Sequence, residues 1–178
     1  MKPADVVTFW MQAGPKAWFK KSEVFDAQIR QRFEALHFAA SRGELDDWGQ
    51  TPEGALALLL LLDQFPRNLF RGSPHAFATD PLARETARAA IARGFDTRVD
   101  AELRQFFYLP FEHSEHIEDQ DRSVALCAAS GDAHLEKWAK LHRDIIARFG
   151  RFPHRNACLG RTTTEEESAF LKGGGFAG

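Results

Sequence analysis

The chain has 178 residues, of which 44% are hydrophobic and 27% charged, and its formal net charge is −2. This composition is that of a globular protein with one substantial core, and the slight acidity gives no overall attraction to nucleic acid or anionic membranes. The longest apolar run, residues 55–62, is far shorter than the ~20 residues that cross a bilayer. Two cysteines are too few for a disulfide scaffold and no leader is recognisable. We therefore expect a cytoplasmic protein that binds neither nucleic acid nor membrane.

The first part of the chain predicts two helices separated by a break. Pro3 suits the first turn of a helix that the Gly14-Pro15 pair ends. Ser22 is a suitable N-cap for a longer helix, in which apolar residues recur at spacings of three and four until Gly43.

The middle of the chain predicts a buried helix. A start signal, Thr51-Pro52-Glu53, precedes a run that is apolar on all sides of the helix, which places this helix at the centre of the fold. We expect the helix to end at Phe65, because Pro66 disfavours a helical conformation in the residue before it.

Helical patterns continue to the end of the chain, over residues 80–94, 100–108, 114–130, 135–149 and the segment after a capping box at 163–167. Pro110 is expected to end the second of these, Ser114 to cap the third, and His142 to lie on the apolar face of the fourth. No segment alternates as strands do. The sequence predicts an all-α fold of about seven or eight helices, with one domain over residues 1–172 and a flexible tail over 173–178.

Three polar segments stand at the ends of predicted helices. The first, residues 63–72, begins beside the buried helix, so its acids need a partner such as an arginine. It is either a structural ion pair or the floor of a pocket.

The second polar segment, residues 111–121, holds two histidines and five acids. Their spacing matches no metal-binding signature, and acids are expected in a first helical turn, so we predict no metal site and no cofactor. A solvated helix start is one interpretation, and an acid/base role for His113 and Glu115 is another.

The third polar segment, residues 148–161, holds four arginines and no acid. Arginine's planar fork of donors suits carboxylates and phosphates. The segment therefore predicts either an anion site or ion pairs with acids of the other two segments. A nucleophilic role for Cys158 beside His154 is disfavoured, because a lone cysteine is more often an apolar filler.

Taken in order, the motifs DQFPRN, YLPFEHSE and RFGRFPHRN resemble the bacterial family catalogued as domain of unknown function nine-two-four, from about Lys2 to Lys172. The resemblance implies an all-α, tetratricopeptide-repeat-like domain of antiparallel helix pairs, and it implies no activity. The chain departs from the family pattern at Cys158, where an aliphatic residue is expected, and at Thr163, where a proline is usual. The motif residues carried over are Asp63, Gln64, Arg67, Asn68, Arg71, Glu112, His113, Ser114, Glu115, Arg151, His154, Arg155, Asn156 and Arg161.

The leading hypothesis is that the three segments converge on one cleft that binds a small phosphate- or carboxylate-bearing molecule. The predicted ligand-binding residues are Asp63, Gln64, Arg67, Asn68, Arg71, Glu112, Arg151, Arg155, Asn156 and Arg161. His113, Glu115 and His154 are the candidates for proton transfer if the protein is an enzyme, which the sequence leaves open together with its oligomeric state. The alternatives are an interaction module that captures an acidic peptide or a C-terminus, and a purely structural polar network.

Overall fold

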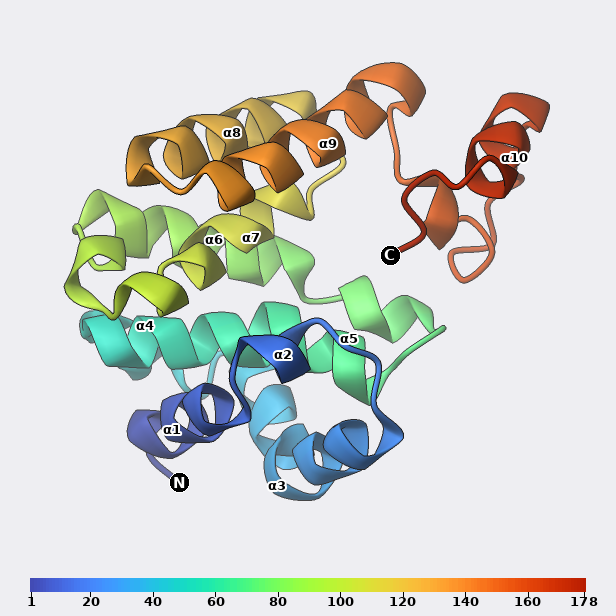
Figure 1. Cartoon of the computed structure of the whole chain (residues 1–178). Coiled ribbons are helices and arrows are strands. Elements are labelled where there is room, and N and C mark those ends of the chain that lie inside the picture. Colours follow the sequence, from blue (N-terminus) through green and yellow to red (C-terminus); the bar gives the residue numbers. More distant parts are fainter. The chain divides into compact units, whose positions relative to one another are not determined.

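The computed structural model describes all 178 residues, and every regular element in it is helical (Figure 1). The predicted all-α class is confirmed, although helices of one or two turns make the count higher than expected. None of the helices combines the length and apolar character that crossing a membrane would take. The α-helices are α1 (Pro3–Ala13), α2 (Pro15–Trp18), α3 (Glu23–Ser41), α4 (Pro52–Leu59), α5 (Phe65–Leu69), α6 (Asp80–Ala92), α7 (Gln105–Glu112), α8 (Ile117–Ser130), α9 (Ala133–Phe149) and α10 (Glu165–Lys172).

The contacts of the chain fall into two compact units. Unit 1 comprises Met1–Arg71 with His75–Pro110, and unit 2 comprises Gly72–Pro74 with Phe111–Gly178. The expectation of one domain over residues 1–172 stays a prediction. The tetratricopeptide-repeat-like arrangement also stays a prediction.

The core of unit 1 forms around α4, which packs against both α1 and α6 (Figure 1). All residues of the apolar run 55–62 are buried, which confirms the predicted central helix. Aromatic rings fill the space beside it, with Trp10, Phe33, Phe65 and Phe106 almost fully buried. Burial of such large apolar side chains is the main stabilising contribution to a core of this kind.

The central helix does not end at Phe65, contrary to the prediction from Pro66. The chain continues through a π-helical turn, Leu60–Gln64, directly into α5. In this wider turn the Phe65 N–H bonds to the Leu60 carbonyl, five residues back. In a regular α-helix the proline ring would clash with the carbonyl four residues back, and its missing N–H would leave one helical hydrogen bond unformed. The wider spacing of a π turn reduces this conflict. Asp63 and Gln64 thereby lie in the buried interior, as expected.

Two further expectations about helix ends are wrong. Pro110 lies inside α7, which continues to Glu112, because the buried rings of Phe106 and Phe107 hold this helix in the core. The N-cap of α8 is His116 and not Ser114, whose hydroxyl instead donates to a carboxylate oxygen of Asp119 at 2.8 Å.

Unit 2 is built on the adjacent helices α8 and α9 (Figure 1). Gly131 lets the chain turn between them, since its φ of 76° is a left-handed conformation that favours glycine. Ile145 and Ile146 of α9 form a buried apolar cluster with Phe152. Phe170 of α10 and Phe176 pack against this cluster, so the C-terminal segment contacts the unit. Flexibility of residues 173–178 stays a prediction.

Candidate functional site

The first polar segment lies in unit 1, where Arg67 is held by two buried carboxylates. Its Nη1 and Nη2 donate to the two carboxylate oxygens of Asp80 at 2.9 and 3.1 Å, and Nη1 lies 3.3 Å from Oδ1 of Asp63. Burial opposes the charge of Arg67, but Asp63 and Asp80 outweigh it and raise the pKa of the guanidinium. Gln64 donates to the other oxygen of Asp63. This cluster has the geometry of a structural ion pair.

Asn68 and Arg71 meet on a single carboxylate of α3. Asn68 Nδ2 donates to Oδ1 of Asp26 at 2.8 Å, and Arg71 Nε donates to Oδ2 at 2.6 Å. Arg71 is exposed, with 36% of its side-chain surface accessible to solvent. Arg71 therefore lies at the surface of unit 1, whereas Asn68 is buried with 6% of its surface exposed.

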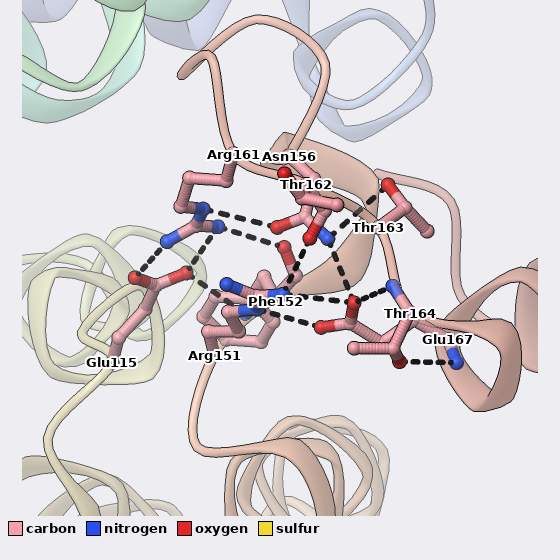
Figure 2. A network of polar contacts seen from close by, with 9 residues as sticks. All are labelled: Glu115, Arg151, Phe152, Asn156, Arg161, Thr162, Thr163, Thr164 and Glu167. Atoms are coloured by element: carbon pink, nitrogen blue, oxygen red, sulfur yellow. Dashed lines mark hydrogen bonds and ion pairs between the residues drawn. The ribbon is translucent and has the colours of Figure 1, made fainter.

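In unit 2 the second and third polar segments meet through Glu115 and Arg161 (Figure 2). Arg161 donates to both oxygens of Glu115, at 2.7 and 3.0 Å, and the backbone N–H of Phe152 donates to the same carboxylate at 2.8 Å. Desolvation of Glu115 acts to raise its pKa, but these donors outweigh it and lower the pKa. Glu115 is therefore ionised near neutral pH, and its two oxygens are already occupied by donors.

A second ion pair of unit 2 joins Arg151 to Glu167 of α10. Arg151 Nε and Nη2 donate to the two oxygens of Glu167 at 2.6 and 2.9 Å, and Thr164 N–H adds a third bond at 2.8 Å (Figure 2). The hydrogen bonds from Arg151 and Thr164 lower the pKa of Glu167 to about 2.

Asn156 links the two ion pairs into one network. Its Oδ1 accepts a bond from Arg161 Nε at 3.0 Å, and its Nδ2 donates to Glu167 at 3.1 Å (Figure 2). Asn156 is fully buried, and every donor and acceptor of its amide in this network faces a protein group. The network thus fixes the loop of residues 150–164 to α10 through internal contacts.

Arg155 and His154 lie beside this network, also within unit 2. The Arg155 guanidinium stacks 4.5 Å from the ring centroid of Phe152 and is buried. Burial, reinforced by the charge of Arg155, lowers the pKa of His154 to about 4. His154 is consequently neutral near pH 7, so it is a weak base and does not supply the imidazolium that a general acid needs.

A histidine that the sequence placed on an apolar helix face belongs to the same cluster. His142 Nδ1 lies 2.9 Å from the Trp138 carbonyl and 3.1 Å from Oε1 of Glu112. Burial lowers the pKa of His142 to about 4, and it outweighs the hydrogen bond with the Trp138 carbonyl, which acts to raise this pKa. The charge of His113 acts on both His142 and His154, so three histidines lie near one another. The sequence indicated the position of His142 only through its spacing of four residues from Trp138, which places both on one helix face.

The predicted residues are thus brought together in two sets. Unit 1 holds the residues of the first polar segment, which are Asp63, Gln64, Arg67, Asn68 and Arg71. Unit 2 holds those of the second and third, which are Glu112, His113, Glu115, Arg151, His154, Arg155, Asn156 and Arg161. Their convergence on one cleft stays a prediction. No group of three or more histidine, cysteine, aspartate or glutamate side chains is placed to hold a metal ion. The Cys158 thiol donates to the Arg155 carbonyl at 3.2 Å.

Two open grooves lie on unit 1. The α3–α5 groove, of about 520 Å³, has Asn68 and Arg71 in its lining, and its other polar lining residues are Lys21, Glu23, Asp26, Arg30 and Gln31. The α1–α3 groove, of about 810 Å³, is lined by Lys16, Lys20, Lys21 and Arg32 above Phe9 and Phe25. The sequence motifs did not point to Lys21 or Arg30. The available signal was that Arg30 follows Asp26 by four positions and so shares its helix face.

Comparison with known proteins gives the family of the chain. The family described as "Bacterial protein of unknown function (DUF924)" matches residues 6–175. A solved structure of a protein of unknown function from Agrobacterium tumefaciens is 53% identical, with a TM-score of 0.93 over 96% of this chain and 97% of that one. No curated protein matches. The match over nearly the whole length, together with the three motifs, shows that the chain belongs to this family of bacterial proteins of unknown function.

Proposed function

We propose that the protein binds a small anionic molecule, carrying a phosphate or a carboxylate, in the α3–α5 groove of unit 1. The supporting observation is that Asn68 and Arg71, two of the ligand-binding residues predicted from the sequence, line this open groove together with Arg30 and Lys21. The arginines of unit 2 that pair with Glu115 and Glu167 are less suitable, because their donors face internal carboxylates.

The charges of the groove favour an anion. Lys21, Arg30 and Arg71 outnumber the two carboxylates, Glu23 and Asp26, and one of those carboxylates is already bonded to Arg71. Lys21 forms no salt bridge. The lining residues therefore carry one excess positive charge, which a monoanion would neutralise.

Donors remain for a ligand even on the paired arginines. Arg71 uses Nε and Nη2 on Asp26, which leaves the two protons of Nη1. Arg30 uses Nη1 on Glu34 and Nη2 on the Leu69 carbonyl, which leaves Nε. With the ammonium of Lys21, these groups suit the oxygens of a phosphate or carboxylate. A groove of about 520 Å³ is within the usual size range of small-molecule sites.

No reaction is part of the proposal. The candidates for proton transfer, His113, Glu115 and His154, belong to unit 2, and Glu115 is fully engaged by Arg161 and Phe152. The groove itself holds no histidine or cysteine.

The test is a thermal-shift titration with inorganic phosphate and with citrate at constant low ionic strength. A ligand at about a hundred times its dissociation constant should stabilise the wild type by about 3 kcal/mol. Arg71→Gln should weaken binding about tenfold or more, because it removes a charged donor. Lys20→Gln is the matched control, since Lys20 is an exposed cation that lines only the other groove. Equal shifts in the two variants, or no saturable shift in the wild type, would contradict the proposal.

A further inference from the structure

The α1–α3 groove of unit 1 carries four cations and no acid. Lys16, Lys20, Lys21 and Arg32 line it, all four are exposed, and no carboxylate belongs to its lining. None of the four forms a salt bridge. Like charges gathered in this way repel one another unless water or a bound anion offsets them. In a protein of net charge −2, the groove is a local concentration of unneutralised positive charge.

The floor of this groove is apolar. Phe9 and Phe25 line it with 9% and 8% of their surface exposed, together with Ala13 and Ala17, and the remaining lining residues are the uncharged Gln12, Ser22 and Gln28. The Arg32 guanidinium stacks 4.7 Å from the ring centroid of Phe9, which holds its charge at the edge of the floor. The groove thus has an apolar floor with positive charges around it, and it suits a ligand that carries both apolar groups and negative charges.

The spread of the cations favours an extended ligand over a single anion. From Ser22, which caps α3, to Arg32 the helix rises about 15 Å at 1.5 Å per residue. One phosphate or carboxylate cannot bridge that length. An extended peptide covers it in about five residues at ~3.3 Å each.

We propose that the α1–α3 groove binds an acidic peptide segment that carries an apolar side chain. The carboxylates of the segment pair with Lys16, Lys20, Lys21 and Arg32, and its apolar side chain packs on Phe9 and Phe25. A single-stranded nucleic acid is less well matched, because the protein as a whole is slightly acidic, with a net charge of −2. The proposal goes beyond the small-anion site, and only Lys21 lines both grooves.

The experiment measures fluorescence anisotropy of a labelled peptide in which glutamates alternate with leucines, titrated with the full chain. We expect saturable binding that weakens as salt is added and that a matching glutamine–leucine peptide does not show. Lys16→Glu and Lys20→Glu should each raise the dissociation constant by about tenfold, since each reverses a charge at the rim. Unchanged thermal unfolding of both variants establishes that they fold.

Arg71→Gln is the control variant, because Arg71 lines only the α3–α5 groove. It should bind the acidic peptide as the wild type does, so that this proposal and the small-anion proposal can fail separately. Three results would overturn the inference: equal affinity in the charge-reversed variants, equal affinity for the glutamine–leucine peptide, or tighter binding of a labelled oligothymidylate than of the acidic peptide.

Discussion

At the scale of single residues, Glu167 is the side chain on which the polar network of unit 2 depends most. It accepts hydrogen bonds from Arg151, Asn156 and Thr164, and only 2% of its surface is exposed. Its low pKa means that the folded protein favours the ionised form more strongly than the unfolded chain does. The carboxylate therefore stabilises the folded state above its ordinary pKa of 4.5, and this stabilisation is lost as the pH falls toward 2.

We predict that Glu167→Gln lowers the free energy of unfolding by about 2 kcal/mol near neutral pH, because it removes charge-assisted bonds from a buried site. The difference between variant and wild type should shrink as the pH falls below 4.5, and urea denaturation across pH measures it. Glu166→Gln is the control, since the Glu166–Arg148 pair is exposed and should contribute at most about 0.5 kcal/mol. Equal losses in the two variants would show that the network does not depend on Glu167.

The arginine segment shows what single residues in a sequence can and cannot predict. Its composition predicted either an anion site or ion pairs with acids of the other two segments, because arginine suits both. Arg161 pairs with Glu115 of the second segment, but Arg151 pairs with Glu167, which belongs to neither segment. The partner acids could not be chosen, because Glu167 lies 16 residues after Arg151 and Glu115 lies 46 residues before Arg161. Such pairings depend on the fold and leave no local spacing in the sequence.

At the scale of elements, the segment after α10 contacts a buried histidine, His142, and a half-buried one, His154, in unit 2. The ring of Phe176 lies 4.5 Å from the ring centroid of His142 and 5.2 Å from that of His154. Burial is the main cause of the low pKa, about 4, of both imidazoles. Because the folded state favours the neutral rings, their contribution to stability is full above pH 6.5 and is lost as the pH falls through 4.

Phe176→Ala should admit water to both imidazoles and raise the pKa of His142 and of His154 from about 4 toward 6.5. An NMR titration of the ring C–H signals measures both values directly. The same titration of Phe19→Ala, whose ring is 62% exposed in unit 1, should leave them unchanged. If both values stay near 4 in Phe176→Ala, the ring does not shield the histidines.

Capping hydroxyls predicted the starts of two helices but not of α8, whose N-cap is His116 and not Ser114. Ser22 and Thr51 cap α3 and α4 as expected, each accepting the backbone N–H three residues later, because a capping hydroxyl acts locally. The helix ends predicted from the two prolines were wrong, since Pro66 follows a π turn that continues into α5 and Pro110 lies inside α7. In both places buried side chains outweigh a local preference of the backbone, and a sequence pattern does not show which of the two prevails.

At the scale of the whole molecule, the all-α class and the family follow from the sequence, and the location of open surface does not. Helical periodicity and the three motifs are spread over the full chain, which is why they identify a family that matches residues 6–175. Apart from Asn68 and Arg71, in contrast, the charged and polar residues that line the grooves lie outside the motifs, as Lys21 and Arg30 do. The polar motifs therefore predict which segments carry charged side chains, whereas the three-dimensional structure is needed to locate the open grooves in which such side chains can contact a ligand.

The central claim is that an anion binds in the α3–α5 groove and not at the paired arginines of unit 2. The most direct test is an NMR titration with inorganic phosphate that follows the Nε–H signals of the arginine side chains. The account predicts saturable shifts for Arg30 and Arg71, with Arg151 and Arg161 unchanged. Shifts confined to Arg151 and Arg161 would contradict it and would locate the anion site in unit 2.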